Sequence, residues 1–236
     1  MTITEFMILC SRLSLSSDAL FQIERELESN LDWKELAGKA RREEVGPLLY
    51  RNLKRFENRI PPLAKENLLD LYSKVTIRNI YIFQQLRPLL QAIHDCNLNV
   101  LVTKGARLAE TLYQNISLRP FRDVDFVVFP EHWQELKQIL KRLGFRQEMD
   151  FDSILNQKKK GKQKAISSAF RKGRLTVEMH FNCLGLEIPF SSEKDFWESV
   201  RMATIGGSPA KILAEEYELC YLCLHALQHS YQRLIW

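Results

Sequence analysis

The stretch RPFRDVDFVVF, residues 119–129, combines a strongly apolar run with two acidic side chains. From Val124 to Phe129 the residues are β-branched or aromatic apart from Asp125, a composition that predicts a buried strand. Asp123 and Asp125 lie at its start, and because strand side chains alternate between faces, both carboxylates project from the same face. Two like charges repel each other and each resists burial, so the pattern raises the hypothesis of a bound cation.

A cation of the Mg²⁺ type fits such a pair, because it takes oxygen ligands and is commonly held by one or two carboxylates plus substrate phosphates. The segment TVEMHFN, residues 176–182, alternates polar and apolar residues as a strand does, and it places Glu178 and His180 on one face. Glu178 is therefore the candidate third carboxylate. For His180 we expect contact with the acid rather than metal ligation, since Mg²⁺ avoids imidazole. The alternative for the Asp-x-Asp pair is a solvated strand end without a metal.

The composition is that of an ordinary globular protein. The 236 residues are 45% hydrophobic and 27% charged, enough for one large domain or two small ones. The N-terminus has no basic leader, and no apolar run approaches the roughly 20 residues of a membrane span. Five scattered cysteines do not form a disulfide framework, so we predict a cytoplasmic protein without a membrane partner.

The apolar periodicity changes from helical to strand-like near residue 97 and back again near the C-terminus. We expect helices over residues 1–97, with Asn30 as an N-cap and with Pro88 kinking or splitting the helix over 63–97. We expect residues 98–190 to form the nucleus of the fold and residues 191–236 to form a C-terminal helical region, and we expect this region to continue beyond Trp236 in the natural protein. The expected core elements are a strand at 100–102, a turn at 104–105, a helix at 106–114, a strand at 123–129, a helix at 130–143, a strand at 145–149, and a hairpin of 165–170 with 175–181.

Two further clusters have both a structural and a functional interpretation. Residues 153–177 contain eight Lys or Arg and no acid, which indicates either a solvated hairpin tip or a patch for phosphates or nucleic acid. The helix CYLCLHALQH, residues 220–229, suggests zinc, but its cysteines and histidines lie on different faces. We therefore interpret Cys220 and Cys223 as core cysteines and the histidines as a pair.

Several ordered motifs are carried together by this chain. They are Thr103-Lys104-Gly105, Tyr113, Leu118-Arg119-Pro120, Asp123-Val124-Asp125, Leu143-Gly144-Phe145 and Val177-Glu178-Met179-His180-Phe181. In this order they resemble the nucleotidyltransferase superfamily, and more closely the bacterial group of uncharacterised nucleotidyltransferase family proteins. The resemblance extends over nearly the whole sequence.

The resemblance implies an α+β fold with a short mixed sheet, flanked by N-terminal and C-terminal helices. It also implies Mg²⁺-dependent (or Mn²⁺-dependent) transfer of a nucleoside monophosphate from an NTP such as ATP to an acceptor hydroxyl, with release of pyrophosphate. Asp123, Asp125 and Glu178 would be the catalytic metal ligands. Gly105 would let the backbone approach the triphosphate, and Lys104 or Arg119 would pair with phosphate oxygens.

For two of these residues, and for the whole chain, alternatives stay open. Lys104 is either a phosphate ligand or an exposed turn lysine, and Arg119 either binds phosphate or orients Asp123 or Asp125. In addition, two residues depart from the pattern of the family. Ala106 stands where the superfamily usually has serine, and Glu178 where the group more often has Asp.

These departures leave an alternative function open, namely a catalytically silent protein that binds a nucleotide or a protein partner. A metal-dependent glycosyltransferase is disfavoured, because such enzymes usually have a larger nucleotide-binding domain before Asp-x-Asp. The acceptor is RNA, a protein or a small molecule.

Overall fold

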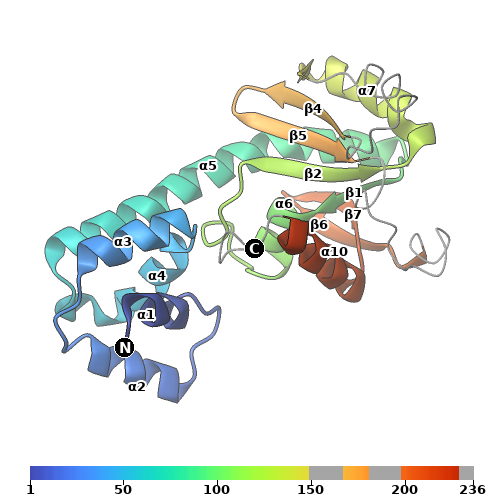
Figure 1. The fold of residues 1–236 in the computed structure, drawn as a ribbon. Helices are drawn as coiled ribbons and strands as arrows, with labels where there is room; N and C mark the ends of the chain where they lie inside the picture. The colour runs from blue at the N-terminus through green and yellow to red at the C-terminus, as the bar shows by residue number, and fades with distance from the viewer. Residues whose placement is uncertain (149–166, 181–197, 229–236) are drawn as a thin grey trace. The chain divides into compact units, whose positions relative to one another are not determined.

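The computed structural model describes residues 1–148, 167–180 and 198–228 (Figure 1). These residues form two compact units. The first contains residues 1–80 and 113–120, and the second contains the described residues of 81–112 and 121–230. None of the helices in the described ranges is long and apolar enough to cross a membrane.

The first unit is helical. Its elements are α1 (Ile3–Cys10), α2 (Ser17–Glu26), α3 (Trp33–Arg42), α4 (Gly46–Leu53), the 3-10 helix η1 (Lys54–Arg59) and the first part of α5 (Pro62–Asp95). Phe6, Ile23 and Leu49 lie in one buried apolar cluster that these helices share. The expected N-cap Asn30 is wrong, because α3 is capped by Asp32, whose carboxylate accepts the Glu35 N–H at 2.9 Å.

Helix α5 runs without interruption for 34 residues and contains Pro88. The expected splitting of this helix at Pro88 is therefore wrong. Proline removes the hydrogen bond to the carbonyl four residues earlier, which is that of Gln84. Gln84 and Pro88 are both exposed, so water can bond the released carbonyl and the helix continues.

A seven-stranded sheet forms the second unit, in the order β3-β4-β5-β2-β1-β7-β6. The strands are β1 (Val100–Thr103), β2 (Asp123–Val128), β3 (Arg146–Gln147), β4 (Ser167–Lys172), β5 (Leu175–His180), β6 (Arg201–Ile205) and β7 (Ser208–Ile212). β2 pairs with β5 in parallel and β1 with β7 in parallel, whereas the other pairs are antiparallel. The predicted α+β fold with a mixed sheet is thus confirmed.

Helices cover this sheet and complete its core. They are the later part of α5, α6 (Lys104–Thr111), the 3-10 helix η2 (Pro130–His132), α7 (Trp133–Arg142) and α10 (Glu215–Gln228). α10 packs against the central strands through Tyr221, which shares a buried cluster with Leu101 of β1 and Val127 of β2. β1 is buried throughout, and β2 is buried from Val124 onward. The two central strands therefore form a rigid platform for the polar residues at their ends.

Residues 201–212 form a hairpin. They lie in the segment 191–236, for which the sequence predicts a helical region. β6 and β7 extend the same sheet that contains β1. The turn between them is Gly206-Gly207, with φ of 60° and 75°, a left-handed geometry that glycine adopts without strain. The domain boundaries at residues 97 and 190 stay a prediction.

Candidate functional site

The register of two parallel strands brings the acidic residues together. Asp125 of β2 pairs directly with Glu178 of β5, and Asp123 pairs with Thr176. In β5 the residues alternate, with Val177 and its apolar neighbours buried and Glu178 half-buried. Because paired residues on adjacent strands point to the same face, the three carboxylates share one face of the sheet. The candidate third carboxylate, Glu178, thus lies on the strand next to that of the Asp pair.

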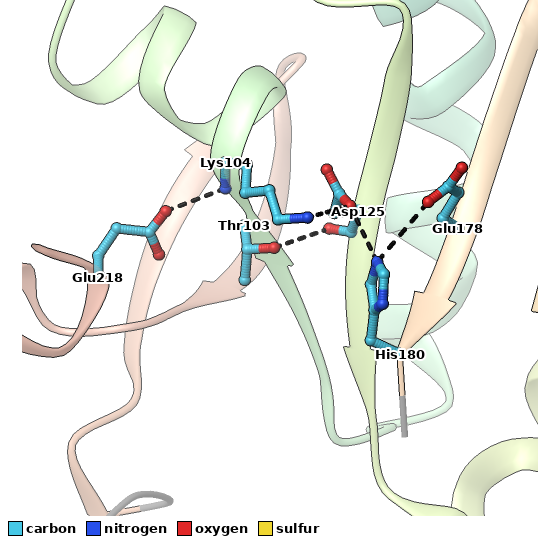
Figure 2. A network of polar contacts seen from close by, with 6 residues as sticks. All are labelled: Thr103, Lys104, Asp125, Glu178, His180 and Glu218. Atoms are coloured by element: carbon cyan, nitrogen blue, oxygen red, sulfur yellow. Dashed lines mark hydrogen bonds and ion pairs between the residues drawn. The ribbon is translucent and has the colours of Figure 1, made fainter. Parts of the chain in front are cut away.

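Asp125 lies at the centre of the polar contacts (Figure 2). Its Oδ1 is 2.6 Å from Nζ of Lys104 and 2.9 Å from Nε2 of His180. The same imidazole nitrogen is 3.9 Å from Oε2 of Glu178. The acid for which contact with His180 is predicted, Glu178, is thus the more distant of the two, and the short contact of His180 is with the buried Asp125.

The carboxylates have opposite electrostatic environments. Burial alone would raise the pKa of Asp125, but the hydrogen bond with His180 and the charge of Lys104 outweigh burial and lower that pKa to about 2. Burial and then the charge of Asp125 raise the pKa of Asp123. Burial and the charges of Asp125 and Asp123 raise the pKa of Glu178. Asp125 is therefore held ionised, whereas Asp123 and Glu178 repel it and each other.

Two of the donors at this site, the carboxylates of Asp125 and Glu178, suit a hard divalent cation. Asp125, Glu178 and His180 each offer a ligand atom, and these atoms lie within 4.8 Å of one another; Asp123 is outside that group. Asp123 lies two residues before Asp125 in β2 and projects from the same face, and the charge of Asp125 contributes to the raised pKa of Asp123. A cation would relieve the repulsion between the carboxylates, and carboxylate oxygens are the ligands that Mg²⁺ and Mn²⁺ prefer.

Lys104 is the first residue of α6 and follows β1 directly. Its side chain is 13% exposed, so the alternative of an exposed turn lysine is wrong. Its backbone has a φ of 52°, in the left-handed region that residues with a Cβ rarely adopt. The ammonium group lies 5.5 Å from the ring centre of Tyr221 and is aimed at Asp125.

Gly105 has a packing requirement that the sequence did not reveal. A Cβ at this position would lie 2.5 Å from the Cβ of Phe121, closer than real contacts allow. The absence of a side chain at Gly105 is thus explained by close packing inside the second unit. Its predicted role beside the triphosphate stays a prediction.

Arg119 is described within the first unit. Its guanidinium is buried and lies 5.8 Å from the ring centre of Tyr113, while its carbonyl accepts a hydrogen bond of 2.8 Å from Asn79. These contacts hold the segment 113–120 against α5. Phosphate binding by Arg119 stays a prediction.

Two residues of α10 that the sequence analysis did not single out face this site. Glu218 is 1% exposed and its Oε1 accepts the backbone N–H of Lys104 at 3.0 Å. Tyr221, one turn further along α10, lies beside the ammonium of Lys104. The sequence does contain a signal for Glu218. It is spaced three and six residues before the apolar residues Tyr221 and Leu224, which predicts an acidic side chain on the buried face of the helix.

The two cysteines of α10 are exposed, so the interpretation of Cys220 and Cys223 as core residues is wrong. The helix packs with Tyr221 toward the sheet, and the cysteines lie on other faces. His225 is half-buried, and His229 lies outside the described residues.

Most of the basic segment also lies outside the described residues. Its described part is the turn of the β4–β5 hairpin, where Gly173 adopts a φ of 58°. There Arg171 contacts Glu148 at 3.1 Å, and Lys172 lies 5.8 Å from the ring centre of Phe145. Arg171, Lys172 and Gly173 thus support the interpretation of the basic segment as a hairpin tip. This support covers residues 171–174 and does not extend to the rest of the segment.

A family model described as an uncharacterised nucleotidyltransferase matches residues 29–236. No curated protein gave a match. The chain is similar to a candidate nucleotidyltransferase from Thermotoga maritima, with 20% identity and a TM-score of 0.45 over 63% of this chain and 87% of that chain. It is also similar to ANT(2″)-Ia in complex with adenylyl-2″-tobramycin, with 16% identity and a TM-score of 0.43 over 65% of this chain and 86% of that chain.

Proposed function

This chain belongs to the uncharacterised nucleotidyltransferase family, and on that premise we propose that it transfers a nucleoside monophosphate from an NTP to an acceptor hydroxyl, with release of pyrophosphate. The predicted enzyme class, a nucleotidyltransferase, is confirmed by that membership. The observation that carries the proposed reaction is the direct pairing of Asp125 with Glu178 across two parallel strands, beside the ammonium group of Lys104.

In the proposed reaction the acceptor oxygen attacks the α-phosphorus, the bond from that phosphorus to the oxygen bridging to the β-phosphate breaks, and pyrophosphate leaves. The hydroxyl proton passes to a carboxylate. We assign this role to Glu178, because burial and the neighbouring acids raise its pKa and so make its ionised carboxylate the stronger proton acceptor. Asp125, with a pKa of about 2, stays ionised throughout. The two carboxylates thus have environments suited to different roles.

Asp123, Asp125 and Glu178 would hold Mg²⁺ or Mn²⁺, which when bound supplies positive charge to the phosphate oxygens. Lys104 carries a second positive charge at the same place, and we propose that it pairs with the phosphates of the bound NTP. Gly105 in the first turn of α6, and Arg119, are the further residues that we propose for nucleotide binding.

The proposal is tested by incubating the full chain with an α-labelled NTP, Mg²⁺ and a cell extract, and by identifying what becomes labelled. The variant with Asp123→Ala and Asp125→Ala should transfer no label, because the ionised carboxylates are lost. Asp95→Ala, which removes an exposed carboxylate at the end of α5, should transfer as wild type does. Transfer by the double variant at the wild-type rate would contradict the proposed mechanism.

The acceptor class is RNA, a protein side chain or a small molecule. The basic residues 158–174 favour an acceptor rich in phosphate. Changing Lys158, Lys159 and Lys160 to Glu should then weaken acceptor binding and flatten its dependence on salt. Binding that keeps its affinity and salt dependence would remove this suggestion.

A second candidate function is nucleotide binding without transfer. It is favoured by the contact between Lys104 and Asp125, since the ammonium group already neutralises the carboxylate. Calorimetry separates the two functions. NTP binding that is indifferent to Mg²⁺ and to Asp125→Asn would favour the second, whereas binding that needs both would favour the transferase.

A further inference from the structure

Helix α6 begins without a side-chain cap of its own. β1 ends at Thr103 and α6 begins at Lys104, so no loop residues separate them. Thr103 occupies the N-cap position but its side chain makes no capping hydrogen bond, and its hydroxyl instead donates to the carbonyl of Asp125 at 3.3 Å. The N–H groups of a first helical turn have no partner within the helix and need an acceptor from elsewhere.

Glu218 of α10 supplies an acceptor for one of these groups. Its Oε1 lies 3.0 Å from the backbone nitrogen of Lys104, across a separation of 114 residues in the chain. The positive end of the α6 dipole favours a carboxylate at this place. Arg107, one turn further along α6, has its Nε 3.9 Å from the other carboxylate oxygen, so the buried charge of Glu218 has a cation nearby.

Lys104 is consequently held at both ends (Figure 2). Its backbone N–H is bonded by Glu218, and its Nζ lies 2.6 Å from Oδ1 of Asp125. Between these contacts the residue has a φ of 52°. A residue with a Cβ keeps a left-handed backbone only when surrounding contacts hold it there. The contact with Glu218 acts on the backbone itself, whereas the one with Asp125 acts at the end of a flexible side chain.

We propose that Glu218 is a positioning residue for Lys104. Its hydrogen bond maintains the left-handed backbone that directs the ammonium group toward Asp125, and toward the phosphates of a bound NTP. The inference rests on the proposed function for the phosphate contact, but the positioning of Lys104 is a property of the protein without nucleotide. α10 is thereby part of the site, although the candidate metal ligands Asp123, Asp125 and Glu178 all lie in β2 and β5.

Two variants separate the hydrogen bond from the bulk of the side chain. Glu218→Gln keeps an oxygen that accepts the amide hydrogen, whereas Glu218→Met has a similar length and no acceptor there. Should the Met variant not fold, Glu218→Asp takes its place, because it keeps the charge but is one methylene shorter. Glu216→Met, at an exposed position of the same helix, is the matched control.

The first readout is the reactivity of the Lys104 amine in the protein without nucleotide. Acetic anhydride labelling, quantified by mass spectrometry, is expected to be slow at Lys104 and fast at Lys74, whose side chain is 70% exposed. Glu218→Met should raise the rate at Lys104 severalfold, and Glu218→Gln and Glu216→Met should leave it near the wild-type value. An unchanged rate in a folded Met variant would overturn the proposal.

The second readout is the affinity for Mg²⁺-NTP, measured by calorimetry with each of the common NTPs. Loss of a hydrogen bond to a charged group is worth about tenfold, so Glu218→Met should weaken binding by about that factor. In a Lys104→Met background the same change should have almost no effect, because Glu218 acts through Lys104. An equal loss in both backgrounds would show a purely structural role and overturn the proposal.

The two readouts distinguish this proposal from the proposed function. If Glu218→Met raises the labelling rate of Lys104 but the protein binds no NTP, the positioning role of Glu218 is supported and the proposed nucleotidyl transfer is contradicted. NTP binding and transfer by wild type, with labelling and affinity unaffected by Glu218→Met, would support the function and contradict positioning.

Discussion

The ammonium nitrogen of Lys104 lies 2.6 Å from Oδ1 of Asp125, and the two side chains are only 13% and 8% exposed. Burial alone would lower the pKa of Lys104, but the carboxylate of Asp125 raises that pKa above its ordinary value. The two residues thus stabilise each other's charged forms in a place where water is scarce. A residue first considered as a phosphate ligand is in this structure the direct partner of a candidate metal ligand.

This pair should be strongly coupled in stability. Breaking it by Asp125→Asn alone leaves a largely buried cation without its partner, and should lower the free energy of unfolding by about 3 kcal/mol. Adding Lys104→Met should restore part of the loss, with a coupling energy of about 2 kcal/mol in chemical denaturation. Lys74 and Asp70 form a control pair, also at 2.6 Å but with side chains 70% and 43% exposed, and its coupling should stay below about 0.5 kcal/mol. Equal coupling in the two pairs would contradict the prediction.

The contribution of Asp125 to stability should depend on pH in the acid range. A carboxyl whose pKa is lower in the folded protein contributes stability that is complete above the pKa of the unfolded chain and is lost as the pH falls toward the folded value. The folded pKa of Asp125 is about 2, against an ordinary 3.8. Urea titrations should show the stability difference between wild type and Asp125→Asn shrinking by about 2 kcal/mol as the pH falls from about 4 to about 2. A difference that grows on acidification would refute the lowered pKa.

Glu178→Gln should separate function from stability. Loss of a proton acceptor should slow transfer by about 100-fold or more, and loss of a ligand should weaken calorimetric Mn²⁺ binding by about tenfold or more. Stability near neutral pH should be unchanged or slightly raised, because burial and the charges of Asp125 and Asp123 disfavour the ionised form of Glu178. Glu131→Gln, at an exposed carboxylate, is the control. Unaltered Mn²⁺ affinity in Glu178→Gln would remove Glu178 from the metal site.

Gly105→Ala should destabilise the protein through overpacking. The added Cβ meets Phe121, and relieving such a clash costs about 1–3 kcal/mol. Thermal unfolding should show the loss, and Phe121→Gly, which removes the Cβ that the new methyl group meets, should remove most of the additional destabilisation when both changes are combined. If the two costs simply add, the contact between Gly105 and Phe121 is not the reason for glycine at this position.

The central strands and their carboxylates were predictable because their signals are local. The apolar run after Asp123 and the alternation around Glu178 predict strands, and strand geometry assigns each side chain to a face. The hairpin β6–β7 was also within reach, since Gly206-Gly207 between short strand-forming runs is a turn signal. It was not predicted, because residues 191–236 were assigned as a whole to a helical region.

Other features depend on residues that are distant in the sequence. Nothing near Gly105 indicates that Phe121 packs against it, and nothing near Lys104 indicates that its amide is bonded by Glu218. The exposure of Cys220 was equally hidden, because α10 is apolar on more than one face and only packing selects the face that is buried.

The class of the fold, the strands at its centre and the acids at their ends follow from local patterns, because periodicity and like-charge repulsion act between near neighbours. The pairing of Asp125 with Glu178, the contact of Lys104 with Asp125 and the hydrogen bond from the Lys104 backbone to Glu218 become visible in the folded protein alone. Strand register and buried ion pairs depend on how segments far apart in the chain pack together, and no local pattern contains that information.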